Sequence, residues 1–225
     1  MDTILNSPLF GIVLSILAFE IGLYINKKLK SPIFNPLLIA IALIILFLSV
    51  FHIPLESFNV GGSMISMFLA PATAVLAISI YNQFDILKKN FLPIMAGAFV
   101  GSLVSMGSVF FLSKMFGLDS VLTASLIPKS VTAPIAIEIA SQLNGLVPVT
   151  VASVIITGIL GSILAPVLIK IFKVKDPMAA GLAIGTCSHA VGTSKAIELG
   201  EVEGSMSGVA ICIAGIMTVI ISLFL

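Results

Sequence analysis

The sequence predicts an all-α fold: a polytopic transmembrane helical protein with seven to eight membrane segments in two related halves, some of whose helices are broken. Hydrophobic residues make up 59% of the 225 residues and charged residues only 9%, whereas soluble domains carry about 25% charged residues. The apolar runs are about 20 residues long, which is the length of a helix that crosses a bilayer. We therefore expect a single integral membrane domain over residues 1–225.

The composition also excludes several classes of function. The formal net charge is +1, which argues against a nucleic-acid partner. All eleven basic residues are lysines, so a carboxylate would be recognised by a lysine point charge or by backbone N–H groups, and not by a guanidinium fork. We see no metal-ligand spacing of Cys, His and Asp and no glycine-rich nucleotide loop. We therefore expect no metal and no cofactor.

The first half of the chain predicts four membrane segments. They cover about 8–25, 36–51, 63–81 and 91–113. The third segment contains Pro71, which removes one backbone donor and frees a carbonyl one turn earlier, so we expect a helix break there. In the fourth segment, Gly97 and Gly101 have the spacing that lets a neighbouring helix approach closely.

The second half predicts segments at about 120–143, 147–171, 175–204 and 205–225. The first of these is unusual for a membrane helix because it carries prolines, charges and hydroxyl groups. These residues are Pro128, Lys129, Ser130, Thr132, Pro134 and Glu138. A proline followed at once by polar residues resembles a helix start, whose free N–H groups attract an anion. We expect the two prolines to break this segment.

The stretch 175–204 is the second unusual segment, since small residues separate its polar ones. The polar residues are Thr186, Ser188, His189, Thr193, Ser194, Lys195 and Glu198. On an uninterrupted helix, Thr186, His189 and Thr193 would share one face, and Ser188 and Lys195 a neighbouring one. Gly185 and Gly192 permit a break in the middle, which would free backbone groups for a ligand.

Polar groups are costly inside a bilayer, and ionisable residues there are usually functional. We therefore expect a solute pathway, with the carboxylate of an anion against Lys129 or Lys195 and against N–H groups near Ser130 or Ser188. Thr132 and Thr193 complete this part of the candidate site.

His189 is expected to bind a substrate hydroxyl or to carry a proton, and Glu138 is the second proton-coupling candidate. The alternative is that His189 and the hydroxyl groups only bond neighbouring helices or their own helix. An intramembrane Ser/His hydrolase is not expected, because the adjacent Ser188 and His189 would point about 100° apart on a helix.

The two halves of the chain, at about 1–113 and 119–225, have similar sequence patterns. Pro71 lies in a run of small residues that is followed by a charged loop, and His189 lies in a similar setting. Such repeats, with paired broken helices near the middle of the membrane, are typical of secondary transporters. The positions of the lysines conflict with eight full crossings. A re-entrant segment would remove this conflict and make the halves inverted.

Four motifs carry a resemblance to a known family. They are FNPLL at 34–38, LAPATAVLA at 69–77, PKSVTAPIAIEIA at 128–140 and GTCSHAVGTSKAIELG at 185–200. Together they are similar to motifs of the LrgB/CidB family, which includes bacterial antiholin-like proteins and part of the plastidial glycolate/glycerate translocator of plants. The chain departs from the family pattern in having Ala70 and Ala190 in place of glycine and Lys195 in place of arginine.

The resemblance implies a carrier for small monocarboxylates or 2-hydroxy acids, such as pyruvate, lactate, glycolate or glycerate. From the residues we expect uniport or proton symport in preference to sodium coupling, because the sequence has no dense cluster of carboxylates. Asn35 and Thr73, which lie within two of the motifs, join the candidate substrate-binding residues. The alternative implied by the family is an antiholin-like regulator of murein hydrolase activity that moves no solute. It would act with a small holin-like membrane protein of the LrgA/CidA type. For either function we expect a homo-oligomer in the bacterial cytoplasmic membrane.

Overall fold

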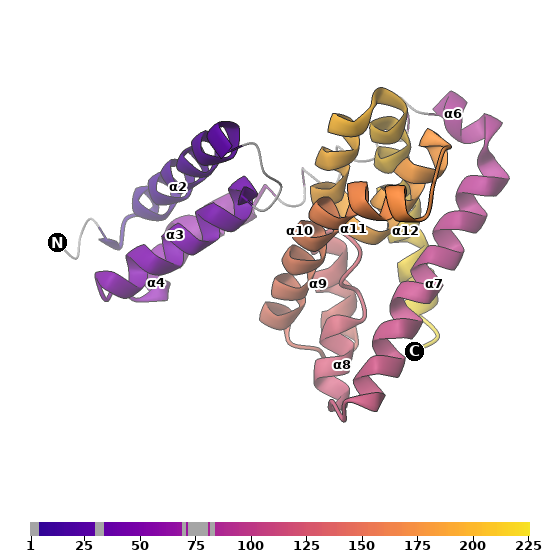
Figure 1. Ribbon diagram of the computed structural model, residues 1–225. Helices are drawn as coiled ribbons and strands as arrows, with labels where there is room; N and C mark the ends of the chain where they lie inside the picture. Colours follow the sequence, from indigo (N-terminus) through magenta and orange to yellow (C-terminus); the bar gives the residue numbers. More distant parts are fainter. Residues whose placement is uncertain (1–4, 30–33, 69–70, 72–80, 82–83) are drawn as a thin grey trace. The chain divides into compact units, whose positions relative to one another are not determined.

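The computed structural model describes residues 5–29, 34–68, 71, 81 and 84–225. Every regular element within these ranges is a helix, as the sequence predicts (Figure 1). The chain forms two compact units, Met1–Ala72 and Thr73–Leu225, and each is described by itself below. The predicted relationship between halves at about 1–113 and 119–225 stays a prediction. These halves meet at the turn after Met115, where Gly117 takes a left-handed conformation with φ +68°.

The first unit contains three described helices: α2 (Pro8–Leu29), α3 (Pro36–Val50) and α4 (Leu55–Ser66). Helix α2 packs against both of the others. Glycines make the contact with α4 close, because a Cβ atom added at Gly61 would collide with the Pro8 carbonyl oxygen and lie 2.8 Å from the Cα of Gly11. Asn35 begins α3, and its Oδ1 accepts hydrogen bonds from the N–H groups of Leu37, at 2.9 Å, and Leu38.

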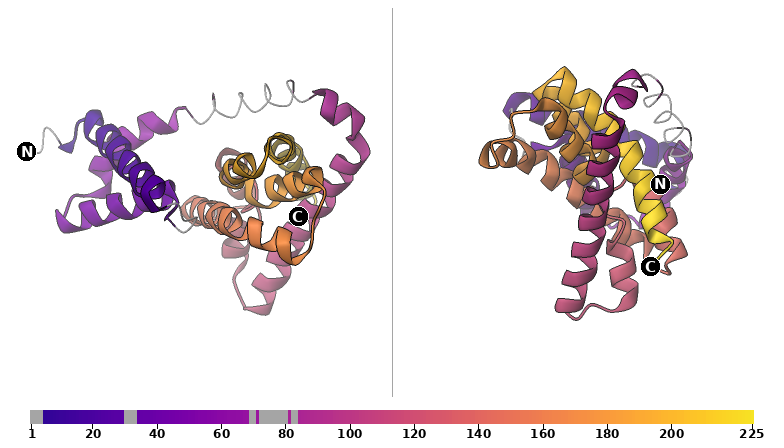
Figure 2. Two further views of the ribbon diagram at one scale, coloured as in Figure 1. Left: turned by 45° about the horizontal axis from the view of Figure 1, so that its top comes forward. Right: turned by 90° about the vertical axis from the view of Figure 1, so that its right-hand side faces the viewer.

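The second unit contains seven described helices: α6 (Phe84–Lys89), α7 (Phe91–Met115), α8 (Ser120–Leu126), α9 (Ala133–Gln142), α10 (Val147–Ile171), α11 (Pro177–Leu199) and α12 (Glu201–Ser222). Helix α12 contacts α7, α9 and α11, and the right-hand view of Figure 2 shows it in yellow beside α7. Buried residues make up 61% of its most apolar stretch, compared with 28% in α7 and α10. Helix α12 is therefore the central helix of this unit.

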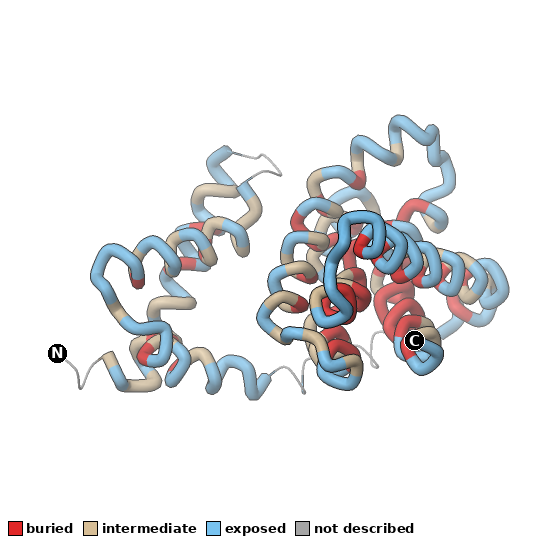
Figure 3. The backbone as a smooth tube through the Cα atoms, turned by 90° about the horizontal axis from the view of Figure 1, so that it is seen from below, coloured by how far each residue is buried: buried red, intermediate tan, exposed pale blue. Residues whose placement is uncertain are grey.

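Four described helices, α2, α7, α10 and α12, are long and apolar enough to cross a membrane. The other predicted segments take different forms. The segment at 36–51 forms the shorter α3, the segment at 120–143 forms two helices, and most of 63–81 lies outside the described residues. Figure 3 shows buried residues gathered inside the second unit and exposed residues along the outer sides of its helices. The predicted count of seven to eight membrane segments stays a prediction.

The close contact predicted for Gly97 and Gly101 of α7 is confirmed. A Cβ atom at Gly97 would lie 2.6 Å from the Leu182 side chain, and one at Gly101 would lie 2.6 Å from Cγ2 of Thr186. Because neither glycine has a side chain, α11 can lie directly against α7. This contact brings the polar stretch of α11 next to the helix that precedes the α8–α9 pair.

Candidate functional site

The predicted break in the segment 120–143 separates α8 from α9. Helix α8 ends at Leu126 and α9 begins at Ala133, so residues 127–132, here named the α8–α9 connection, lie between the two helices. Pro128 lies in the connection, and Pro134 is the second residue of α9, a position where a missing N–H costs no helical hydrogen bond. The two prolines therefore account for both the interruption and the restart.

The polar side chains of the α8–α9 connection are tied to α7. The ammonium group of Lys129 donates to Ser130 Oγ at 3.3 Å, and Ser130 Oγ lies 2.7 Å from Ser105 Oγ on α7. The Lys129 side chain is half-buried. Within the part of the chain that the structure describes, no carboxylate lies within ion-pair distance of its ammonium group.

Thr132 has the most unusual environment in the connection. It precedes the first residue of α9, and its side chain is only 7% exposed. A threonine at this position normally accepts a hydrogen bond from an N–H group in the first turn of the helix, but here it does not. Its Oγ1 is the one buried side-chain nitrogen or oxygen atom, among the described residues, that has no hydrogen-bond partner.

Helix α11 is interrupted at His189, whose φ of 42° and ψ of −144° are not helical. The break predicted in this stretch is therefore present, but its predicted location at Gly185 or Gly192 is wrong, because both glycines keep helical dihedrals. These glycines serve close packing. A Cβ atom at Gly185 would collide with the Ser207 carbonyl oxygen on α12, and one at Gly192 would collide with the Ser188 side chain.

The imidazole ring of His189 is buried against α10. Its Nε2 lies 2.9 Å from the carbonyl oxygen of Val154, and a carbonyl can only accept a hydrogen bond, so Nε2 carries the proton. A Cβ atom at Gly158 would lie 2.6 Å from Cε1 of the ring. One turn further along α10, Gly161 leaves the space that the Ser188 side chain fills.

The hydroxyl group of Thr193 supports the interruption from its carboxy-terminal side. Thr193 Oγ1 donates to the carbonyl oxygen of His189 at 3.0 Å. It also lies 2.7 Å from Ser207 Oγ on α12, and since the Thr193 proton is already used, Ser207 is the donor in that pair. The predicted grouping of polar residues thus joins His189 and Thr193, with Ser207 as an additional member.

The two interruptions come together on α10. Val131 of the connection and Ala136 of α9 form a buried apolar cluster with Val154, whose carbonyl oxygen bonds His189. The broken α8–α9 pair and the broken α11 therefore face a shared region of the unit.

Other predicted site residues lie elsewhere. Lys195 forms an ion pair with Glu198 at 2.7 Å, with the two side chains 22% and 66% exposed. Glu138 is exposed and accepts a hydrogen bond from the Gln142 side chain at 2.9 Å. Asn35 belongs to the first unit, where it caps α3.

The predictions for the segment 63–81 are not tested. Thr73 lies outside the described residues, as do both neighbours of Pro71. The substrate-binding role of Thr73 and the helix break at Pro71 therefore stay predictions.

Several residues of the site were not predicted from the sequence. Ser105, Val154, Gly158 and Ser207 all contact predicted site residues but lie in segments that read as plain apolar spans. The glycines at 158 and 161 were the sequence feature that could have indicated this part of the site, since small residues mark positions where another helix packs closely.

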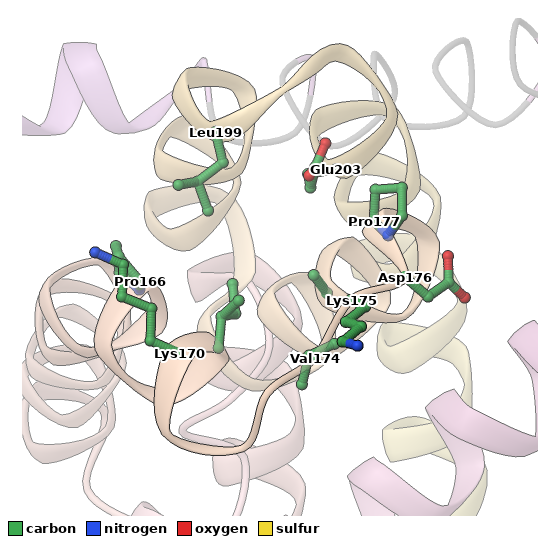
Figure 4. A pocket seen from close by; sticks show the side chains of 10 residues that line it. Pro166, Lys170, Val174, Lys175, Asp176, Pro177, Leu199 and Glu203 are labelled. Carbon is green, nitrogen blue, oxygen red and sulfur yellow. The ribbon is translucent and has the colours of Figure 1, made fainter.

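A pocket of about 180 Å³ lies where α10, α11 and α12 meet near their ends (Figure 4). Lys170, Lys175, Asp176 and Glu203 line it, together with apolar residues. Asp176 is already engaged there, because its Oδ1 accepts from the N–H of Met178 at 3.0 Å at the start of α11. None of the residues at the two interruptions lines this pocket. Within the described ranges, no three His, Cys, Asp or Glu side chains are grouped to hold a metal ion.

Comparison with known proteins gives a consistent result. Residues 15–225 match the model of the LrgB-like family. The chain is similar to the antiholin-like protein LrgB of Bacillus cereus (strain B4264) and to that of Bacillus anthracis (strain A0248), with 40% identity in each case. Each similarity covers 96% of this chain and 94% of the relative. No solved structure matches the chain.

Proposed function

Because this chain belongs to the LrgB-like family and is a multi-pass membrane protein, we propose that it acts as an antiholin-like protein of the bacterial cytoplasmic membrane. In this function it restrains a small holin-like membrane partner of the LrgA type and so limits murein hydrolase activity. The observation that carries the proposal is the extent of similarity to relatives named antiholin-like, which covers 96% of the chain. This similarity includes both units and both interruptions.

Coexpression with the small partner tests this function. We expect the two proteins to purify together from membranes extracted with their native lipid, and the murein hydrolase activity released by the cells to fall below that of cells expressing the partner alone. An unrelated multi-pass membrane protein of similar size, expressed at the same level, is the control. Equal hydrolase activity with and without the chain would contradict the proposal.

A second function is favoured by the interrupted helices: a carrier for small monocarboxylates or 2-hydroxy acids. Polar and ionisable groups inside a membrane usually face a binding cavity or a partner, and broken helices supply the backbone groups that bind substrates in secondary transporters. The contact of both interruptions with Val154 of α10 supports this function. Neither function requires a chemical reaction, so we propose no enzymatic activity.

Proton coupling in such a carrier would use His189. Its Nε2–H is held by the carbonyl oxygen of Val154, which leaves Nδ1 as the nitrogen that would accept a second proton. Glu138 is the weaker candidate, since its carboxylate is exposed and bonded to Gln142 within the same helix.

Flux through purified protein distinguishes the two functions. Proteoliposomes carrying the chain are tested for uptake of labelled pyruvate and glycerate, with and without a pH gradient. The carrier function predicts saturable uptake that His189→Ala abolishes. Wild-type protein that moves none of these acids, yet purifies with the small partner, would leave only the antiholin-like function.

A further inference from the structure

The start of α9 combines three features that the protein's own contacts do not satisfy: a buried hydroxyl group without a partner, free backbone N–H groups, and a half-buried lysine without a carboxylate. We infer that this start binds the carboxylate group of a small monoanion, with Thr132, the first turn of α9 and Lys129 as its binding groups. The inference rests on the carrier function proposed above, and it identifies the site within it.

The Thr132 hydroxyl is the first of these features. A buried hydroxyl group that makes no hydrogen bond destabilises a protein, which is why such groups are rare. Thr132 Oγ1 is in this state, although its position at the start of a helix normally gives it a partner. Pro134 contributes to this, because the second residue of α9 has no N–H to offer. The hydroxyl proton is therefore available to an anion.

The backbone of α9 provides the second feature. The helix has ten residues, and the first N–H groups of an α-helix have no acceptor within the helix. In α9 these belong to Ala133 and Ile135, while the N–H of Ala136 bonds the Thr132 carbonyl oxygen at 2.9 Å. The partial positive charge at a helix start favours a bound anion. Thr132 Oγ1 lies at this same end of the helix.

Lys129 provides the charge. It lies three residues before Thr132, and among the described residues its ammonium group donates one hydrogen bond, to Ser130 Oγ at 3.3 Å. Ser130 is fixed in turn by Ser105 at 2.7 Å. One ammonium group balances one negative charge, whereas a dianion would keep an unbalanced charge in a medium of low dielectric constant. The site is therefore selective for monoanions such as small monocarboxylates.

The second interruption differs from the first in its hydroxyl group and in its lysine. A half-helix also begins after His189, but the Thr193 hydroxyl in its first turn already bonds the His189 carbonyl oxygen and Ser207, and the Ser188 side chain is packed into the space left by Gly161. Lys195 is paired with Glu198. Among the described residues, a fully buried hydroxyl without a partner and a lysine without a carboxylate therefore occur together at the start of α9.

The test uses the purified full chain in lipid nanodiscs and equilibrium binding of labelled pyruvate. Thr132→Val removes the hydroxyl at nearly constant shape, Thr132→Ser keeps a hydroxyl, and Lys129→Met removes the charge. Thr123→Val is the matched control, because the Thr123 hydroxyl is also buried but bonds the Asp119 carbonyl oxygen within its own helical turn.

We expect Thr132→Val and Lys129→Met to weaken pyruvate binding about tenfold or more, the loss typical of a hydrogen bond to a charged group. Thr132→Ser should restore most of the binding that Thr132→Val loses, and Thr123→Val should bind as wild type does. Without pyruvate, Thr132→Val should unfold at the same temperature as wild type or a higher one, since it removes an unsatisfied buried group. A hydroxyl that only holds the fold together would give the opposite shift.

The outcomes separate the site from the function. Wild-type protein that binds and transports pyruvate, while Thr132→Val and Lys129→Met bind it equally well, overturns this site and leaves the carrier function standing. Wild-type protein that neither binds nor moves pyruvate overturns both. Displacement of pyruvate by succinate as effectively as by lactate overturns the selectivity for monoanions.

Discussion

Substituting glycine and alanine separately at His189 tests the interruption of α11 directly. The φ of 42° and ψ of −144° at His189 lie outside the regions that residues with a Cβ atom adopt easily, including the left-handed helical region. Glycine reaches such dihedrals without steric cost. Both substitutions lose the hydrogen bond to Val154, so the difference in stability between the two variants reports the backbone strain at position 189.

The sign of that difference depends on whether the helix is broken. Residues held in sparsely populated regions of φ and ψ cost about 1–3 kcal/mol, so His189→Gly should be more stable than His189→Ala by about that amount. In the interior of a continuous helix, glycine is less stable than alanine by about 1 kcal/mol. An interrupted α11 and a continuous α11 therefore predict opposite orders of stability for the two variants. The predicted stability difference between His189→Gly and His189→Ala changes by about 2–4 kcal/mol from one case to the other.

Unfolding of the two variants in mixed micelles titrated with a denaturing detergent, followed by far-ultraviolet circular dichroism, measures this order. Ala183→Gly provides the control, because Ala183 lies in the regular part of α11 and glycine should destabilise there by about 1 kcal/mol. If alanine is the more stable residue at both positions, α11 is continuous and the interruption at His189 is wrong.

Two further predictions concern the surroundings of this interruption. Gly158→Ala places a Cβ atom 2.6 Å from the buried imidazole ring and should destabilise by about 2–4 kcal/mol through overpacking and the loss of a hydrogen bond. Gly107→Ala is the control, because a Cβ atom there meets no atom within 4 Å, and its unfolding free energy should stay within about 1 kcal/mol of wild type. Equal unfolding free energies for Gly158→Ala and Gly107→Ala would refute the contact between Gly158 and the imidazole ring. Lys195→Met should change the unfolding free energy by less than about 1 kcal/mol, since exposed ion pairs contribute little, and a larger loss in the same titration would show that the lysine has another partner.

The interruption between α8 and α9 was predictable because its cause is local. Proline lacks the N–H that an α-helix interior requires, and Pro128 with Pro134 lies in a segment whose polar residues also disfavour a lipid-facing helix. The structure ends one helix before Pro128 and begins the next just before Pro134. No contact with another part of the chain is needed to explain this.

The position of the break in α11 was not predictable in the same way. Local conformational preference favours Gly185 and Gly192, but these glycines are needed where α11 meets α12 and where Ser188 packs. The strained backbone of His189 is held by a tertiary contact with the Val154 carbonyl oxygen and by the Thr193 hydroxyl one turn later, which is itself bonded to Ser207 on α12. A backbone carbonyl acceptor has no signature in the sequence, since every residue carries one.

The uninterrupted helices explain how two broken segments are held near each other without consuming the groups that would bind an anion. On α10, Val154, Gly158 and Gly161 follow a spacing of four and three residues and so share one face, which contacts His189 and Ser188. At these three positions α10 supplies a carbonyl oxygen and empty space, and no polar side chain.

On α7, Gly101 and Ser105 are one turn apart, and they contact Thr186 of α11 and Ser130 of the α8–α9 connection. Serine-to-serine pairing and glycine contacts fix these positions but leave the ammonium group of Lys129 without a carboxylate and the hydroxyl group of Thr132 without a hydrogen-bond partner within the described chain. A framework that served packing alone would have no reason to hold a lysine and an unbonded hydroxyl beside a free helix start, because each of these lowers stability when it is buried without a partner.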